Sequence, residues 1–147
     1  MIYIEIAEAY ADEVEPAVLS RAAQVTLDNQ ASLPEVDLSV IITHDEQLRQ
    51  LNLQFLDIDS PTDVLSFPAG YMDPDTNRLY LGDILISLPT ALAQSITAAH
   101  PLETELQLLV VHGTLHLLGH DHLDPAEKSR MWSIQNEILS LLGINLA

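Results

Sequence analysis

The segment from Pro101 to Gly119 limits the possible folds more than any other part of the chain. Its first turn carries Glu103 and Glu105, which suit the positive end of a helix dipole. Its second half is apolar nearly all round. A helix without a polar face must be covered by other elements, so we expect it to lie buried at the centre of the molecule. Gly119 is well placed to end this helix.

Hydrophobic periodicity predicts that strands and helices alternate at first and that helices finish the chain. Strands are expected at residues 2–6, 36–43, 62–67 and 80–87, with Pro68 closing the third strand and a loop at 69–79. Helices are expected at 13–30, 89–99, 101–118 and 124–142. A further helix is expected to begin at a capping box formed by Thr43 and Glu46 and to end at about residue 54. This order favours an α+β fold in a single domain, residues 1–147. We expect a small mixed four-stranded sheet surrounded by helices, with a central buried metal-binding helix.

The composition excludes several classes of protein. The absence of cysteine rules out disulfides, thiolate metal sites and cysteine nucleophiles. Five basic against 22 acidic residues give a net charge of −17, which makes an electrostatic clamp on nucleic acid or an anionic membrane a poor expectation. The longest apolar stretch, 106–118, is interrupted by two histidines, and the N-terminus lacks the basic start of a signal peptide. We therefore expect a cytoplasmic protein without a membrane segment.

Four of the six histidines lie within eleven residues, HGTLHLLGHDH at 112–122. His112 and His116 are four residues apart, so both imidazoles project from one helix face and can supply two nitrogens to a metal ion. A third ligand requires the chain to turn back, and Gly119 can adopt the positive φ of such a turn. We expect His122 to be the third ligand, with His120 as the alternative.

The spacing H-x3-H-x2-G-x2-H is that of the extended zinc motif of metzincin proteases. In those enzymes a catalytic glutamate follows the first histidine, whereas this chain has Gly113. The pattern therefore predicts a metal site and disfavours ordinary zinc proteolysis. One zinc ion per chain is the favoured cofactor, because three imidazoles and a water form a common catalytic zinc shell. Nickel, cobalt and copper are compatible with the same ligands.

Two motifs together resemble the YbeY family, bacterial metal-dependent endoribonucleases that are also called ribosomal RNA maturation factors. The similarity extends over about residues 51–143, most of the chain. The residues that carry it are the histidine segment 112–122, Asn52, DSPTDVLSFP at 59–68, LGDI at 81–84, Met131, Gln135 and Gly143.

The resemblance implies zinc bound by His112, His116 and His122, and a small mixed sheet with surrounding helices. It implies cleavage of single-stranded RNA, linked to 16S rRNA 3′-end maturation and ribosome quality control. It also implies that the protein works with the small ribosomal subunit, with an assembly GTPase and ribosomal proteins as partners.

The chain departs from the family pattern near the predicted site. The family usually has Tyr-Arg where this sequence has Phe55-Leu56, and leucine cannot make the forked contact of a guanidinium with a phosphate. His120 stands where tyrosine is common. The motif shows no general base: Asp63 and Asp121 are the nearest carboxylates, and neither is assigned a catalytic role.

Three functional hypotheses follow. The first is a zinc-dependent, single-strand-specific endoribonuclease acting on ribosomal RNA precursors. The second is a zinc hydrolase of another substrate class, such as a peptidase or amidohydrolase, which Gly113 disfavours. The third is a ribosome assembly factor with a structural metal and weak or no nuclease activity, which Leu56 and the net charge of −17 favour.

Overall fold

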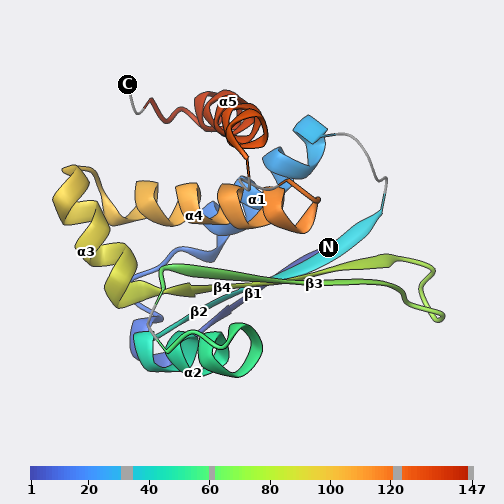
Figure 1. The fold of residues 1–147 in the computed structure, drawn as a ribbon, viewed down its shortest axis with the longest axis horizontal. Helices are drawn as coiled ribbons and strands as arrows, with labels where there is room; N and C mark the ends of the chain where they lie inside the picture. Colours follow the sequence, from blue (N-terminus) through green and yellow to red (C-terminus); the bar gives the residue numbers. More distant parts are fainter. Residues whose placement is uncertain (31–34, 60–61, 121–123, 146–147) are drawn as a thin grey trace.

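A mixed β-sheet forms the middle layer of the protein (Figure 1). The computed structural model describes residues 1–30, 35–59, 62–120 and 124–145, and within them the sheet has four strands in the order β1-β2-β4-β3. β1, β2 and β4 run parallel, and β3 pairs antiparallel with β4 at one edge. The strands are β1 (Ile2–Ile6), β2 (Val36–Thr43), β3 (Val64–Met72) and β4 (Leu79–Ser87).

The helices cover both faces of this sheet (Figure 1). They are α1 (Pro16–Gln30), α2 (Asp45–Leu56), α3 (Leu88–Ala98), α4 (Leu102–Leu117) and α5 (Pro125–Leu141), with a short 3-10 turn η1 (Glu8–Tyr10). α1 and α4 lie on one face, α2 lies on the other, and α5 packs outside α4. The predicted α+β fold with a mixed sheet is therefore confirmed. None of these helices, within the ranges described, is long and apolar enough to cross a membrane.

α4 is the buried centre of the fold, as its apolar second half predicted. Val110, Val111 and Leu115 are fully buried in the main core. Burying one such side chain contributes about 1.5–3 kcal/mol. Gly113 marks a close approach of α4 to the sheet, because a Cβ built there would lie 2.7 Å from Cγ2 of Ile84 in β4. A glycine at this position lets the helix backbone rest directly on the sheet.

The start of α2 differs from the predicted capping box. His44 is the N-cap residue, and its Nδ1 accepts the backbone N–H of Gln47 at 3.3 Å. Thr43 is the last residue of β2, where it pairs with Ser87, and its hydroxyl donates to the Gln47 side chain at 2.6 Å. The expectation that Thr43 caps the helix was wrong: Thr43 still pairs with Ser87 in the sheet, and the helix begins at Asp45, so the cap falls on His44.

The third strand is longer than the sequence predicted. β3 continues through Pro68 to Met72, with a shift in register between Pro68 and Tyr71, so the expected loop at 69–79 is shorter. An edge strand tolerates proline because one side of its backbone has no partner strand. The extension is held by its pairing with β4 and by the ring of Tyr71, which stacks on Tyr80 with centroids 5.5 Å apart.

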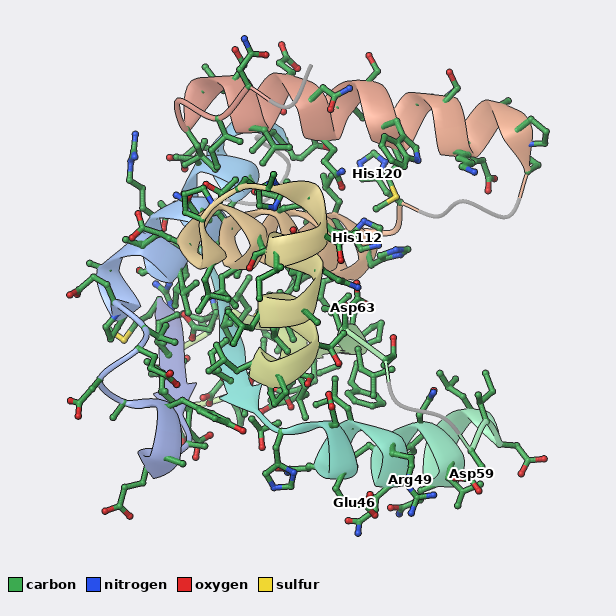
Figure 2. The ribbon with its side chains drawn as sticks, turned by 90° about the vertical axis from the view of Figure 1, so that its left-hand side faces the viewer. Glu46, Arg49, Asp59, Asp63, His112 and His120 are labelled. Atoms are coloured by element: carbon green, nitrogen blue, oxygen red, sulfur yellow. The ribbon has the colours of Figure 1, made fainter. Side chains whose placement is uncertain are left out.

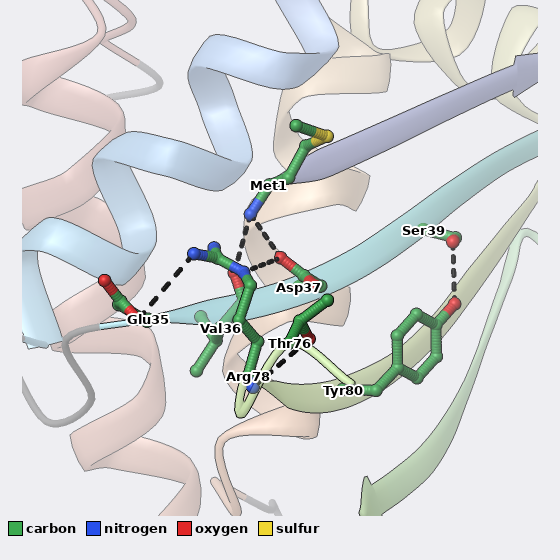
Figure 3. A network of polar contacts seen from close by, with 8 residues as sticks. All are labelled: Met1, Glu35, Val36, Asp37, Ser39, Thr76, Arg78 and Tyr80. Atoms are coloured by element: carbon green, nitrogen blue, oxygen red, sulfur yellow. Dashed lines mark hydrogen bonds and ion pairs between the residues drawn. The ribbon is translucent and has the colours of Figure 1, made fainter. Parts of the chain in front are cut away.

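A polar network ties together the ends of three strands (Figure 3). The carboxylate of Asp37 in β2 accepts hydrogen bonds from the Met1 amino group and from Nε of Arg78, the latter at 2.9 Å. The Met1 amino group also donates to the carbonyl oxygen of Val36 at 2.8 Å. The hydrogen bond from the amino group is the main cause that lowers the pKa of Asp37 below its ordinary 3.8, with Arg78 adding to it against desolvation.

We expect Asp37→Asn to destabilise the protein by about 1–2 kcal/mol at pH 7, since it removes the charged acceptor of two hydrogen bonds. A lowered pKa in the folded state stabilises above pH 4 and loses that effect as the pH falls through the folded value. The difference between wild type and variant in urea unfolding should therefore shrink below pH 4. The exposed Asp12→Asn is the control, and a gap that is constant with pH would contradict this assignment.

We expect Gly113→Ala to destabilise the protein by about 1–3 kcal/mol, because the new methyl group overlaps the fully buried Ile84. Helix propensity alone predicts the opposite sign, a gain of about 1 kcal/mol. Thermal and urea unfolding decide between the two. The exposed Ser133→Ala in α5 is the control for propensity, and a stabilised Gly113→Ala would show that α4 does not rest on the sheet at this point.

Candidate functional site

A cleft with a volume of about 560 Å³ opens where α4, β3 and the end of α2 meet. These three segments are far apart in the sequence, and the sheet and its helices bring them together. The described residues that line the cleft are Leu56, Thr62, Asp63, Val64, Leu65, Ser66, Pro68, His112, His116, Gly119 and His120. The cleft therefore unites the histidine motif and the DSPTDVLSFP motif.

His112 and His116 face each other inside this cleft, as their spacing predicted. Their Nε2 atoms are 3.0 Å apart, and the rings meet edge to face with centroids 4.5 Å apart. Two neutral imidazoles at this distance share either one proton or one cation. Half of the separation is smaller than a zinc–nitrogen bond of about 2.0–2.1 Å, so both nitrogens can bind the same ion. The donor set fits a zinc ion.

Gln135 of α5 orients the first of these histidines. Its Oε1 lies 3.2 Å from Nδ1 of His112, and since a carbonyl oxygen only accepts, Nδ1 carries the proton. The Nε2 lone pair of His112 then points toward the cleft, which is the tautomer that a metal ligand requires. Gln135 was recognised as a family position, but its contact was not foreseen. A polar residue on the buried side of α5, one turn after Met131, was the available signal.

The turn after α4 has the conformation that the sequence predicted. Gly119 has φ +97°, and nothing lies within 4 Å of a Cβ built there, so the backbone conformation and not a lack of space requires glycine. The backbone N–H of His120 closes the turn on the carbonyl of Leu115 at 3.0 Å. His122, the predicted third ligand, and Asp121 lie outside the described residues. Within the described ranges no group of three or more potential ligands is gathered around one point.

His120, the alternative third ligand, has another partner. Its Nε2 donates to Oε1 of Gln30, the last residue of α1, at 2.8 Å. The side chain still lines the cleft, but this ring nitrogen is engaged by α1. The contact joins two residues that are 90 positions apart, and nothing in the local sequence pattern indicated it.

The packing explains why Gly113 replaces the glutamate of zinc proteases. A side chain there would be directed at Ile84 and at Oγ of Ser66, 3.2 Å from the built Cβ, and so into the sheet. Ser66 also donates a hydrogen bond to the Gly113 carbonyl at 3.2 Å. The sheet therefore leaves no room for a catalytic carboxylate at this position.

Asp63 has a structural role at the start of β3. Its Oδ1 accepts the backbone N–H of Val64 at 2.8 Å, and its Oδ2 accepts Nε2 of Gln94 from α3 at 3.3 Å. The carboxylate thus holds the beginning of the strand against α3 while it lines the cleft. These contacts are structural, and the sequence had assigned no catalytic role to Asp63.

The cleft lacks a cationic group among its described lining residues. Leu56, which replaces the family arginine, lines the cleft and is 55% exposed. Arg49, two helical turns before Leu56 on about the same side of α2, forms ion pairs with Glu46 and Asp59 (Figure 2). Two carboxylates therefore share the charge of Arg49, the one basic residue of α2.

Comparison with known proteins identifies the relatives of this chain. The model of a family described as endoribonuclease YbeY matches residues 4–143. Proteins named endoribonuclease YbeY from a Roseiflexus species and from Clavibacter sepedonicus are 40% and 38% identical, covering 97% and 92% of this chain and 92% of each relative. The solution structure of TM1509 from Thermotoga maritima aligns with a TM-score of 0.59 at 25% identity, over 97% of this chain and 92% of that one. This chain belongs to the YbeY endoribonuclease family.

Proposed function

We propose that this protein is a zinc-dependent endoribonuclease that hydrolyses phosphodiester bonds in single-stranded RNA. The observation that carries the proposal is the pair of facing Nε2 atoms of His112 and His116, 3.0 Å apart in a cleft. The shared description of the relatives as endoribonucleases supports RNA as the substrate.

One zinc ion would be held by His112, His116 and His122. His122 is preferred to His120 because Gln30 engages the Nε2 of His120. When bound, zinc supplies a positive charge that activates water and stabilises negative charge on a phosphate.

The protein's own groups organise the cleft around these ligands. Gln135 holds the proton of His112 at Nδ1 and thereby fixes the ring and its tautomer. Ser66 connects β3 to the Gly113 carbonyl, so the strand wall and the helix wall of the cleft keep their separation. Such support matters because a displacement of about 1 Å in a catalytic group costs on the order of 100-fold in rate.

The proposed biological role is 16S rRNA 3′-end maturation and ribosome quality control on the small ribosomal subunit, in the cytoplasm. An assembly GTPase and ribosomal proteins are the proposed partners. A dependence on partners agrees with the net charge of −17 and with Leu56 in the cleft, both of which weaken the grip of the isolated protein on RNA.

A second candidate is an assembly factor in which zinc has only a structural role. The absence of lysine and arginine among the described residues of the cleft favours it. In that case the metal would stabilise the turn between α4 and α5. Subunit maturation supported by a zinc-bound protein that cleaves no RNA would establish this alternative.

We expect His116→Ala to lose bound zinc and to reduce cleavage of single-stranded RNA by more than about 100-fold, since loss of residues that merely orient a ligand already costs 10–100-fold. Elemental analysis measures the zinc, and a labelled RNA strand reports cleavage. His44→Ala, outside the cleft, is the control and should retain both properties. Normal zinc content and cleavage in His116→Ala would refute the proposed site.

We expect Leu56→Arg to increase RNA cleavage by about tenfold at subsaturating substrate, because a charge-assisted contact with phosphate contributes about 1.5–3 kcal/mol. Gln54→Arg adds the same charge to an exposed position of α2 outside the described lining of the cleft. Initial rates at low RNA concentration compare the two variants. An equal gain in both would mean that net charge, and not a contact in the cleft, limits the reaction.

A further inference from the structure

The first turns of α5 carry a lysine and a tryptophan on the side of the helix that leads to the cleft. Gln135, in contact with His112, marks the side of α5 that faces α4, whose histidines line the cleft. At about 100° per residue, Lys128 lies about 20° and Trp132 about 60° around the helix axis from Gln135. Arg130 lies about 140° away, on the opposite side.

Lys128 is an available cation in an acidic protein. Of the five basic residues, Arg49 and Arg78 form ion pairs, whereas Arg21, Lys128 and Arg130 form none with any residue that the structure describes. Lys128 is exposed, and Trp132, the only tryptophan of the chain, is 55% exposed. An exposed aromatic ring beside an unpaired cation is the arrangement by which proteins hold single-stranded nucleic acid.

The position of this pair suits a strand that enters or leaves the cleft. Seven residues of helix separate Lys128 from Gln135, which corresponds to about 10 Å along the axis. In Figure 2 the first half of α5 passes beyond His120, above the side of the molecule where His112 and Asp63 lie.

We propose that Lys128 and Trp132 hold the RNA substrate just outside the cleft, with Lys128 on a phosphate and Trp132 stacked on an unpaired base. The inference rests on the proposed RNA substrate and adds residues to its binding. It also accounts for how a strand is held although Leu56 and the other described lining residues provide no cation. Stacking requires unpaired bases, so the same contact selects single strands over duplexes.

The single tryptophan provides a direct test of stacking. Its fluorescence is measured while a 2′-O-methyl oligouridylate of about 12 nucleotides, which resists cleavage, is added. We expect quenching that saturates at the same concentration as fluorescence anisotropy of the labelled strand. Binding without quenching, or no binding at all, would overturn the proposal.

Matched variants test the geometry. We expect Lys128→Ala to weaken binding and to reduce the slope of log affinity against log salt by about 0.7, the value for one phosphate contact on a single strand. Arg130→Ala removes the same charge from the opposite side of α5 and should bind like wild type. Trp132→Ala should bind about tenfold more weakly and Trp132→Phe nearly normally. Equal losses in Lys128→Ala and Arg130→Ala would overturn the proposal.

Cleavage assays on the same variants separate this inference from the proposed function. If wild type cleaves RNA and both Lys128→Ala and Trp132→Ala do so at the wild-type rate at subsaturating RNA, the inference fails and the proposed function stands. If wild type binds with quenching and the expected variant effects but cleaves nothing, the inference stands and the proposed function fails.

Discussion

The close contact between α4 and the sheet at Gly113 is the constraint on which the rest of the site depends. Without a side chain at this position, the helix backbone comes close enough for its carbonyl to accept the Ser66 hydroxyl, and Ile84 fills the space that a Cβ would need. This contact sets the distance between the wall formed by β3 and the wall formed by α4. His112 lies one residue before this contact and His116 lies three residues after it, and both side chains line the cleft. The same packing leaves no space for the glutamate that zinc proteases carry at this position. One contact therefore both holds the helix against the sheet and excludes that catalytic group.

The positions of the basic side chains place the proposed RNA contacts outside the centre of the cleft. The chain has 22 acidic and five basic residues, and two of the arginines serve ion pairs within the fold. The pair of Arg78 with Asp37 is an example. Asp37 accepts hydrogen bonds from the Met1 amino group and from Arg78, and so joins the starts of β1 and β2 to the residue before β4. Arg49 is likewise held by α2 and its following segment. Positive charge is therefore scarce at the cleft, and a polyanion is left with basic residues outside the cleft, such as Lys128 of α5, and with partner molecules.

Local pattern predicted much of the fold and part of the site. The apolar second half of the segment at 101–118 predicted a buried central helix, and the structure has it as α4. The four-residue spacing of His112 and His116 predicted that their rings meet, and Gly119 has the expected positive φ. Errors occurred where a neighbouring element decided the outcome. The cap of α2 is His44 and not Thr43, and β3 passes Pro68 because it is an edge strand paired on one side.

The sequence by itself determined what depends on residues a few positions apart: helix faces, the turn at Gly119 and the histidine pair. Only the tertiary structure decided which distant groups complete the site. Gln135 reaches His112 and Gln30 reaches His120 because α5 and α1 pack beside the end of α4. Hydrophobic periodicity relates residues that lie within a few helical turns of each other. These two contacts join residues 23 and 90 positions apart, and they follow from how the helices cross over the sheet.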